Sequence, residues 1–513
     1  MEHVLEQTAR RLPERLALVV GEDSRTWSAL EQEVADFAAG LAARGVRAGE
    51  CVALALDNSI EACVAILGCL RLGAVFVCLN PTIKEDKLRA LLEHSTAVAF
   101  ITDVPHLELM QGGRGYMPNL CVVVGADAAA DTLGYGELLE TDGGSRPVAL
   151  ASSAPAELAA IIYTSGTTGQ PKGVMHSRGS LASVSAKIGT YLEVRSSDVI
   201  LSVLPLSFGY GLTQLLVAVQ TGACLVLERR MGYPAAFLGQ IARRGVTIVP
   251  VVPTISAMLL RLNLTKFDLG SLRVITSAGA HLPAEQARRW RAALPEIHLY
   301  NMYGQTECIR ASYLHPLDAD DHPGTIGRGL AGQEWGLIQA DGRPAAVGEV
   351  GELVLASDHM MLGYWEDPER TARVLRSNPL PEGAYSRAVY TGDLFRSDGE
   401  GYLSFVARRD DMLNSRGELV SPREVEDVIA EFPGISEVAV YGSPDEVLGT
   451  AIWASVVVDV SRAPSEAEVM RHCAAHLEDH MIPSGLEFRD DLPRTPNGKI
   501  ARAELSRARE AMR

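Results

Sequence analysis

The sequence predicts an α/β fold: a large N-terminal domain of parallel-rich sheets with helices, containing a β-rich subdomain, followed by a small α+β C-terminal domain. Three observations support this fold class. Strand and helix patterns alternate from the N-terminus, residues 325–405 change to short strands between frequent turns, and a smaller mixed pattern follows a charged stretch at 408–411. Because parallel strands need a crossover connection, usually a helix, the alternation indicates parallel sheets with helices on their faces. At 513 residues the chain can form about three domains or subdomains, each with its own core.

The first part of the chain shows the alternation most clearly. Ser28 and Glu31 have the spacing of a capping box, and the apolar stripe of an amphipathic helix follows and ends near Gly45. The stripe consists of Leu30, Val34, Phe37 and Leu41. The chain then predicts strands and intervening helices in the order 51–56, 59–72, 74–78, 83–93 and 98–102. The alternation returns in the segments 199–204, 212–219, 224–227, 235–244, 247–252 and 272–276.

Turn signals become frequent after about residue 325. The dipeptides Asp341-Gly342 and Asp398-Gly399 lie among short strands at 351–356 and 402–406. This pattern predicts a β-rich subdomain over about 325–409.

A cluster of four charged residues, 408–411, separates this subdomain from the C-terminal segment. We place the domain boundary at Asp410, which predicts domains at 1–409 and 410–513. The second domain is expected to contain strands near 437–442 and 451–459 and a helix capped by Ser465-x-x-Glu468.

Composition and charge exclude several classes of protein. Apolar residues make up 47% of the chain and charged residues 22%, as in globular proteins. The formal net charge of −17 opposes sequence-independent binding to nucleic acid, which needs a basic face. No run of about 18 uncharged apolar residues is present, and the N-terminus lacks the basic and apolar regions of a secretory signal. A cytoplasmic protein without a membrane span or a nucleic-acid partner is therefore expected.

The cysteines are scattered, and no two of them form a Cys-x-x-Cys pair. Most have apolar neighbours, which predicts buried, reduced thiols rather than disulfides or zinc ligands. They occupy positions 51, 63, 69, 78, 121, 224, 308 and 473.

The segment 163–173 is the strongest functional indication. It contains four Ser and Thr hydroxyls, three glycines and one lysine, directly after the apolar run 158–162. Backbone N–H groups in such a turn form a concave site for anions, and a lysine adds a charge suited to phosphate oxygens. An ordinary surface turn is the alternative. The candidate ligands of a polyphosphate are Thr164, Ser165, Gly166, Thr167, Thr168, Gly169 and Lys172. A Walker loop does not fit, because the sixth residue from Gly166 is Pro171 and Lys172 precedes Gly173.

Two further motifs carry groups that suit a nucleotide. In the segment 300–307, the ring of Tyr303 before Gly304 can stack on a base, and Thr306 offers a hydroxyl to a phosphate oxygen. Glu307 offers a carboxylate for Mg²⁺, which takes one or two carboxylates along with substrate phosphates. Asp393 follows Thr391-Gly392, and its carboxylate can accept two hydrogen bonds from a diol. Taken alone, each motif also fits an ordinary turn.

These motifs, together with 277–280 and 493–500, resemble in composition and order the motifs of the adenylate-forming superfamily. Its members are acyl- and aryl-CoA synthetases, peptide-synthetase adenylation domains and luciferases. The quoted motifs span 163–499, and the N-terminal alternation extends the resemblance to almost the full chain. The resemblance implies that the segment 163–173 binds the β- and γ-phosphates of ATP.

The resemblance implies a role for each further matching residue. Gly279 and Ala280 would form a wall for adenine and the acyl group, and Asp393 and Arg408 would hold the ribose. Lys499 would be the catalytic lysine, acting with Glu307 and Thr306. Asp410 matches the hinge about which the C-terminal domain rotates, and Gly417 the path of pantetheine. The chain departs from the family pattern at Gln305, Ala407, Asn414 and Arg416, and the last two leave the thioester step open.

The implied reaction joins a carboxylic acid to ATP, with Mg²⁺, to give an acyl-adenylate and pyrophosphate, and then transfers the acyl group to coenzyme A. Amino-acid-activating members carry an Asp after an aromatic residue, whereas Gly209 follows Phe208 here. A fatty, aryl or alicyclic acid is therefore expected, with Gly209 and Gly211 providing room. The predicted acyl pocket consists of Phe208, Gly209, Tyr210, Val252 and Ser277.

Other functions are compatible with parts of the pattern. A free-standing enzyme that loads an acyl carrier protein is the nearest alternative, followed by a luciferase-like oxygenase and a degenerate nucleotide-binding protein. An aminoacyl-tRNA synthetase is opposed by the acidic charge and by the absence of a His-x-Gly-His motif. The sequence leaves open the acid, the pathway and the oligomeric state, for which a homodimer is one option.

Overall fold

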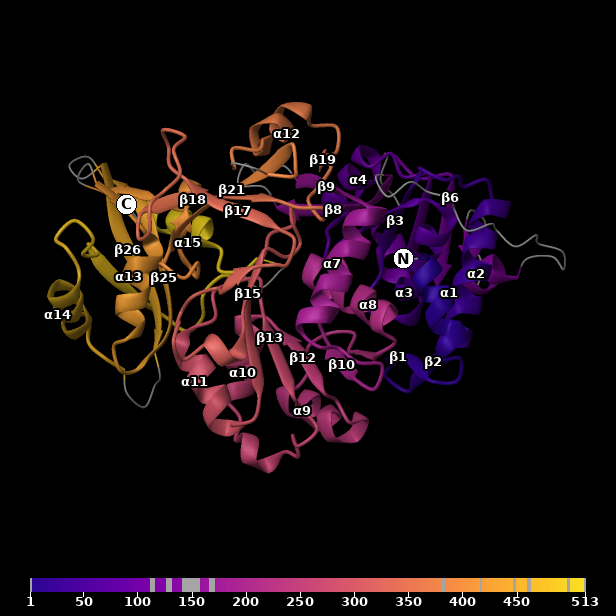
Figure 1. Ribbon diagram of the computed structural model, residues 1–513, viewed down its shortest axis with the longest axis horizontal. Coiled ribbons are helices and arrows are strands. Elements are labelled where there is room, and N and C mark those ends of the chain that lie inside the picture. Colours follow the sequence, from indigo (N-terminus) through magenta and orange to yellow (C-terminus); the bar gives the residue numbers. More distant parts are fainter. Residues whose placement is uncertain are drawn as a thin grey trace. The chain divides into compact units, whose positions relative to one another are not determined.

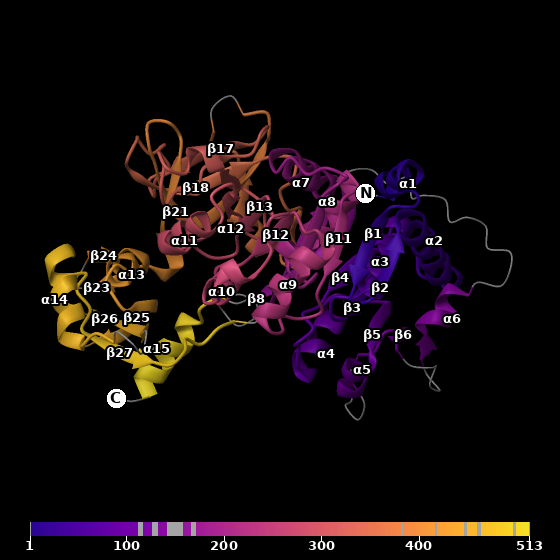
Figure 2. The same ribbon diagram turned by 90° about the horizontal axis from the view of Figure 1, so that it is seen from below.

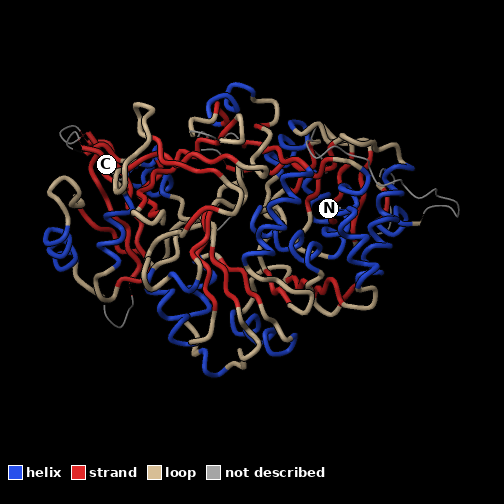
Figure 3. Tube along the Cα trace, viewed as in Figure 1, coloured by secondary structure: helices blue, strands red, loops and turns tan. Residues whose placement is uncertain are grey.

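The computed structural model describes residues 2–110, 116–125, 132–140, 157–165, 171–380, 383–415, 418–445, 449–458, 463–495 and 499–511. They form two compact units. Unit 1 comprises Met1–Glu334 and Leu355–Val389, and unit 2 comprises Trp335–Val354 and Tyr390–Arg513. Figure 1 labels the elements, and Figure 3 shows helices and strands intermixed through the molecule, which confirms the α/β class.

The first sheet of unit 1 is parallel in its centre and antiparallel at its edges. Its Val- and Ile-rich central strands suit burial on both faces. In spatial order it consists of β16 (Arg328–Gly329), β15 (Ser312–Leu314), β14 (His298–Tyr303), β13 (Val274–Ser277), β12 (Ile248–Val251), β10 (Val199–Ser202), β11 (Cys224–Leu227), β1 (Leu16–Val20) and β2 (Asp23–Thr26).

The second sheet of unit 1 is parallel except at one edge, where two antiparallel pairings lie side by side. In spatial order it consists of β19 (Gly363–Tyr364), β9 (Pro171–Ser177), β8 (Leu158–Ser165), β4 (Val75–Cys78), β3 (Cys51–Ala55), β5 (Ala99–Asp103), β6 (Leu120–Val124) and β7 (Leu133–Gly134). The predicted strands and helices at 51–102 and 199–276 are confirmed to within a few residues.

The helices of unit 1 lie between the two sheets and on their outer faces. They are α1 (Glu2–Arg11), α2 (Trp27–Ala43), α3 (Ile60–Leu72), α4 (Glu85–His94), α5 (Val104–Met110), α6 (Tyr135–Leu139), α7 (Arg178–Tyr191), α8 (Gly209–Thr221), α9 (Pro234–Arg244), α10 (Pro253–Leu260), α11 (Ala284–Ala293) and α12 (Pro368–Val374). Side chains of α2, α3, α7 and α8 share one core with strands of both sheets. Helix α3 is apolar on nearly all sides, as a helix between two sheets must be. The outer faces are covered by α9–α11 on the first sheet and by α4 and α5 on the second, as Figure 2 shows.

The predicted capping box at Ser28 and Glu31 is wrong. Helix α2 begins at Trp27, and its N-cap is Thr26, whose hydroxyl accepts a hydrogen bond from the backbone N–H of Ala29 at 3.2 Å. Ser28 instead donates to the carbonyl of Pro13, and Glu31 forms an ion pair with Arg71. Because Thr26 ends β2 in an extended conformation, it meets the requirement for an N-cap two residues before Ser28. The predicted apolar stripe of α2 is buried, as expected.

Unit 2 is built mainly on a sheet with helices packed against it. In spatial order this sheet consists of β24 (Glu418–Val420), β23 (Leu413–Ser415), β26 (Gly449–Val458) and β25 (Ile435–Asp445), with β27 (Gly485–Arg489) parallel to β26. Its helices are α13 (Pro422–Ala430), α14 (Glu466–His476) and α15 (Arg502–Ala511). The predicted capping box of Ser465 and Glu468 is present at the start of α14.

A further sheet is formed by the turn-rich segment. It has the order β17 (Glu334–Ile338), β18 (Val350–Ala356), β21 (Arg387–Ser397) and β20 (Leu375–Ser377), with β22 (Leu403–Arg408) beside β21. The division between the units falls within strands of this sheet, whereas the hinge at Asp410 remains a proposal about motion.

The cysteines are free, as predicted, and all except the partly exposed Cys224 are buried. Burial raises the pKa of Cys51, for example, to about 12. In the part of the chain that the structure describes, no helix has a stretch long and apolar enough to cross a bilayer.

Candidate active site

The predicted phosphate-binding segment connects two antiparallel strands. In the register of β8 and β9, Thr164 lies opposite Lys172. The predicted ligands Gly166, Thr167, Thr168 and Gly169 lie outside the described residues, as does the side chain of Ser165. The strand pairing thus brings Thr164 and Lys172 side by side, next to the end at which the connecting segment joins the two strands.

The edge strand β19 adds an aromatic pair to this hairpin. Tyr364 lies opposite Val174, and the backbone N–H of Trp365 donates to the carbonyl of Gly173 at 2.7 Å. A Cβ atom at Gly173 would lie 2.8 Å from Cγ2 of Ile161 and 3.2 Å from Cβ of Trp365. Glycine at position 173 is therefore required for β19 to approach the hairpin.

Tyr364 links the hairpin to the predicted metal ligand Glu307. Its hydroxyl donates to Oε1 of Glu307 at 2.6 Å, and Nζ of Lys172 lies 5.9 Å from the centroid of its ring. Glu307 is only 8% exposed. Our sequence interpretation missed Tyr364, although an aromatic pair after Gly363 in a turn-rich segment is a feature that could have indicated it.

The segment from Tyr303 to Glu307 is a tight turn clamped by backbone contacts. Tyr303 is the last residue of β14, and a Cβ atom at Gly304 would collide with the carbonyl oxygen of Ile309. The Nε2–H of His176 donates to the carbonyl of Thr306 at 2.8 Å. Burial lowers the pKa of His176 to about 4, so its ring is neutral near pH 7. His176 therefore ties β9 to the residue before Glu307.

Of the predicted acyl-pocket residues, Phe208, Tyr210 and Val252 lie close together. A Cβ atom at Gly279, whose φ is +88°, would lie 3.3 Å from Cζ of Phe208 and 3.4 Å from Cγ1 of Val252. The ring of Phe208 packs edge-on against Tyr210, with a centroid distance of 6.3 Å. Ala280, the next residue after Gly279, is exposed. Gly279 thus permits close packing where Phe208 and Val252 converge.

Ser277 projects to the other face of the first sheet. The hydroxyls of Tyr210 and Thr276 are hydrogen-bonded at 2.5 Å, and successive side chains of a strand point to opposite faces. Ile275, on the same face as Ser277, belongs to the core under α9–α11. Ser277 is therefore separated from Tyr210 by the sheet.

The two glycines expected to widen the acyl pocket differ. Nothing lies within 4 Å of a Cβ atom built at Gly209, so this position borders open space. A Cβ atom at Gly211 would instead collide with the carbonyl oxygen of Pro205. The expectation is wrong for Gly211, because it serves the close approach of α8 to the preceding loop.

These side chains follow the carboxyl ends of neighbouring parallel strands. The segment 204–210 follows β10, Val252 follows β12, 277–280 ends β13, and 303–307 ends β14. In open α/β sheets ligands bind outside the carboxyl ends of the strands. The site therefore lies where a ligand of this fold is expected.

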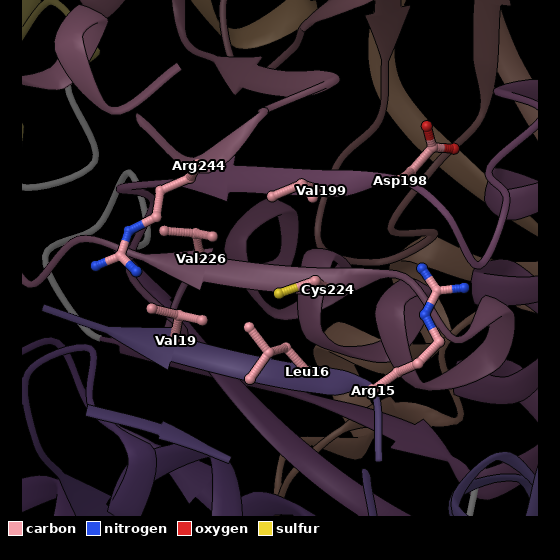
Figure 4. Close-up of a pocket in the computed structure, with 8 residues that line it drawn as sticks. All are labelled: Arg15, Leu16, Val19, Asp198, Val199, Cys224, Val226 and Arg244. Carbon is pink, nitrogen blue, oxygen red and sulfur yellow. The ribbon is translucent and has the colours of Figure 1, made fainter. Parts of the chain in front are cut away.

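A cavity of about 280 Å³ lies elsewhere on the first sheet (Figure 4). Leu16, Val199 and Cys224, which line it, are the first residues of β1, β10 and β11. Because this is the amino end of the strands, and because no predicted site residue lines the cavity, we do not assign the reaction to it. Its lining residues are Arg15, Leu16, Val19, Asp198, Val199, Cys224, Val226 and Arg244.

Unit 2 holds the predicted ribose ligands. Nε of Arg408 donates to Oδ1 of Asp393 at 2.8 Å, across a pairing of β21 with β22. Asp393 is 3% exposed, and Gly392 before it has a φ of +71° and donates its N–H to Glu352. The structure therefore brings Asp393 and Arg408 together.

The predicted catalytic lysine also lies in unit 2. Lys499 is exposed; its backbone N–H donates to the hydroxyl of Thr495, and its carbonyl accepts from the backbone N–H of Thr495. Asp410 is exposed in a short 3₁₀ helix, Arg409–Asp411. The prediction for Gly417 lies outside the described residues, as does Arg416.

The protein side chains suit magnesium that arrives with a nucleotide. No cluster of three or more His, Cys, Asp or Glu residues that could hold a metal is present among the described residues. Mg²⁺ is commonly held by one or two carboxylates and substrate phosphates, so a lone buried Glu307 beside the phosphate hairpin fits this use.

The fold and this arrangement define an adenylate-forming enzyme. The chain matches the family model described as AMP-binding enzyme over residues 5–365 and the model described as AMP-binding enzyme C-terminal domain over residues 424–499. The chain therefore belongs to the family of AMP-binding enzymes. It is an AMP-forming acid–thiol ligase of the adenylate-forming superfamily.

Similar proteins cover nearly the whole chain. Indoleacetate–CoA ligase of Aromatoleum aromaticum is 31% identical over 503 residues, which is 97% of this chain and 94% of that protein. L-proline–[L-prolyl-carrier protein] ligase of Pseudomonas fluorescens is 32% identical over 504 residues, 97% of either chain.

Solved structures show the same fold. Anthranilate CoA ligase AuaEII in complex with anthranoyl-AMP is 28% identical, with a TM-score of 0.89 over 99% of this chain and 96% of that one. O-succinylbenzoate coenzyme A synthetase (MenE) of Bacillus subtilis, in complex with ATP and magnesium ion, is 27% identical, with a TM-score of 0.83 over 98% of both chains.

Proposed function

We propose that this enzyme activates a carboxylic acid other than an amino acid with ATP and then transfers the acyl group to coenzyme A. The observation that supports it most is the cluster of Lys172, Tyr364 and Glu307, which joins the phosphate hairpin to a buried carboxylate. A cation and a carboxylate that lie against the same tyrosine suit a polyphosphate with its Mg²⁺, whose α-phosphate is to be attacked.

In the first step a carboxylate oxygen attacks the α-phosphorus of ATP, and the bond to the β-phosphate breaks with release of pyrophosphate. Two anions must approach each other, so positive charge is needed at the reacting phosphate. Lys172 and Thr164 would hold the departing pyrophosphate, and Asp393 and Arg408 the ribose. Mg²⁺, held by Glu307 and the phosphates, would neutralise charge there. Lys499 would contact both the carboxylate and the α-phosphate.

The site offers no partner for the ammonium group of an amino acid on the element that carries the aromatic wall. No Asp or Glu occurs between Asp198 and Glu228, a stretch that includes Phe208 and Tyr210. An unpaired buried ammonium would be costly. We therefore propose a fatty, aryl or alicyclic acid, whose hydrocarbon part packs against Phe208 and Val252.

For the second step we propose the thiol of coenzyme A as the acceptor, with rotation at Asp410 withdrawing Lys499 and bringing Gly417 to the pantetheine path. One relative is named a CoA ligase and another a carrier-protein ligase. A phosphopantetheine thiol on a carrier protein is therefore the second candidate acceptor.

Pyrophosphate release measured over classes of acid, with and without CoA, tests the proposal. We expect release with non-amino acids and thioester formation when CoA is added. The variant Lys499→Ala should release pyrophosphate at least about a hundredfold more slowly, because a charge at the reacting phosphate is lost. Release with amino acids alone would overturn the substrate class. Acylation of a carrier protein, with no acyl-CoA formed, would show that the acceptor is the carrier-protein thiol and not coenzyme A.

A further inference from the structure

A charged side chain that the proposed reaction does not use lies beside the acyl pocket. Arg310 follows Glu307 by three residues and is 2% exposed. Within the part of the chain that the structure describes, its Nε has no hydrogen-bond partner and no carboxylate forms an ion pair with it. Its Cζ lies 5.1 Å from the centroid of the Tyr210 ring, to which Phe208 packs edge-on.

A buried guanidinium without an anion is energetically unfavourable. Arginine cannot lose its proton in a protein, so Arg310 stays charged, and burying an unpaired charge is costly. Another arginine of this chain, Arg502 of α15, has a carboxylate as its counter-ion. It forms hydrogen bonds of 2.7 and 2.8 Å with the two carboxylate oxygens of Glu426. The cation–π contact of Arg310 with the Tyr210 ring supplies only part of the stabilisation that a carboxylate counter-ion would give.

The backbone around Arg310 is held in place. The preceding residue, Ile309, has a φ of +57°, which is strained for a β-branched side chain. Its N–H donates to the carbonyl of Gln305 at 2.7 Å, and the Nε2–H of the buried His359 donates to the carbonyl of Arg310 at 3.0 Å. Strained residues persist where the surrounding structure over-determines them, and they cluster at ligand sites.

The position of Arg310 relates it to the substrate rather than to the nucleotide. Gly304 contacts the Arg310 backbone, since a Cβ atom there would lie 3.0 Å from Cα of Arg310. The guanidinium extends from this turn to Tyr210, on the helix whose start forms the aromatic wall. The charge thus lies at the wall of the acyl pocket, on the turn that also carries Glu307.

We propose that Arg310 pairs with a second anionic group on the acid, so that the preferred substrates are dicarboxylic acids of which one carboxylate is activated. A guanidinium presents a planar fork of donors that matches a carboxylate bidentately. The distal carboxylate takes no part in the bond changes and supplies the missing counter-ion. This inference rests on the proposed function and narrows its substrate class.

The test measures kcat/KM for pyrophosphate release by the wild-type enzyme with pairs of acids that share one carbon skeleton and differ by one carboxylate. The pairs are hexanoic and adipic acid, and benzoic and isophthalic acid. We expect a dicarboxylic acid to be preferred by at least about tenfold, because a site built for a polar group discriminates strongly against its absence. In Arg310→Met this preference should disappear, so that the ratio of kcat/KM for the dicarboxylic and monocarboxylic acid of each pair falls to about one. Arg310→Lys should retain part of the preference, because it keeps the charge without the fork.

Arg288→Met is the matched control, since Arg288 is an exposed residue of α11. The preference should be unchanged in it. Should Arg310→Met fail to fold, the kcat/KM ratios of the paired acids in wild type and in Arg310→Lys still test whether Arg310 binds a second carboxylate. Equal wild-type rates on paired acids, or an unchanged preference in Arg310→Met, would overturn the role of Arg310 and leave acid activation standing. Release with no acid of any class would overturn the proposed function and this inference together.

Discussion

At the scale of single residues, the turn after β14 depends on buried partners that are distant in sequence. His176 donates to the carbonyl of Thr306, Tyr364 to the carboxylate of Glu307, and the N–H of Met361 to the Glu307 carbonyl at 2.9 Å. These hydrogen bonds hold the Glu307 carboxylate, which we propose as the ligand of Mg²⁺, in one orientation before any ligand binds. Such preorganisation avoids a rearrangement at the moment of reaction.

The neutral state of His176 makes stability depend on pH. The folded protein keeps this ring unprotonated down to about pH 4, whereas the unfolded chain takes up a proton below about 6.5. The unfolded state therefore binds more protons between these values, and stability should fall as the pH falls, by up to about 1.4 kcal/mol per pH unit. His176→Gln can still donate to Thr306 but does not titrate. Its thermal midpoint should change less than that of wild type between pH 7 and pH 5.

The exposed His298 provides the control for this measurement. His298→Gln should show the wild-type dependence on pH. An equally steep decline in His176→Gln would show that other groups determine the acid sensitivity.

Removal of the Tyr364 hydroxyl should lower the affinity of the enzyme for Mg²⁺ in the proposed reaction. Tyr364→Phe leaves a buried carboxylate oxygen of Glu307 without its donor, at a cost of about 1–3 kcal/mol. We expect pyrophosphate release to fall by about tenfold or more, with a higher Mg²⁺ concentration for the half-maximal rate. Tyr233→Phe, at an exposed tyrosine, should match wild type. If both variants behave alike, Tyr364 has no part in orienting Glu307.

Sequence patterns indicate a site residue when its role depends on close neighbours in the chain. Lys172 and Glu307 each stand in a short string of glycines and hydroxyls, and both are predicted. Tyr364 and Arg310 are missed, because what matters for each is a partner brought near by folding. The misplaced cap of α2 is a similar case, since whether Thr26 or Ser28 caps the helix depends on where β2 ends.

At the scale of elements, alternation of strands and helices predicts each element but not its neighbours. The strands at 51–102 and 199–276 are where the pattern expects them. The pattern does not predict that β1 pairs with β11, or that β19 pairs with β9. These pairings join segments about two hundred residues apart, and they depend on which apolar faces can be covered together rather than on local propensity.

The pairing of β19 with β9 depends on the absence of a side chain at Gly173. In Gly173→Ala the new Cβ atom would meet Ile161 and Trp365, and β19 would have to move away. We expect destabilisation by about 1–3 kcal/mol, measured as a lower thermal midpoint. Gly239→Ala is the control, because nothing lies within 4 Å of a Cβ atom at this helical position. An unchanged midpoint in Gly173→Ala would show that β19 accommodates the side chain.

At the scale of the whole molecule, the groups required for the proposed reaction are divided between the two units. Thr164, Lys172 and Glu307 belong to unit 1, whereas Asp393, Arg408 and Lys499 belong to unit 2. The two proposed half-reactions need different groups, since Lys499 serves adenylate formation and the pantetheine path serves thioester formation. For a chain that carries out both half-reactions, we expect the C-terminal domain to move relative to the rest of the chain between them.

Asp410 is the residue at which we propose that this change occurs, and proline tests it. In the described conformation Asp410 lies in a 3₁₀ turn, whose φ is near the value that proline imposes. Asp410→Pro should therefore fit the φ of this position but hinder a second backbone conformation there, and circular dichroism of the variant checks that it folds. We expect one half-reaction to be retained within a few-fold and the other to fall by at least about tenfold, measured as pyrophosphate release and acyl-CoA formation in single turnovers. Asp410→Ala removes the same carboxylate without fixing φ, so both half-reactions should continue in it. Equal losses of both half-reactions in Asp410→Pro, or a loss of neither, would place the hinge elsewhere in the chain.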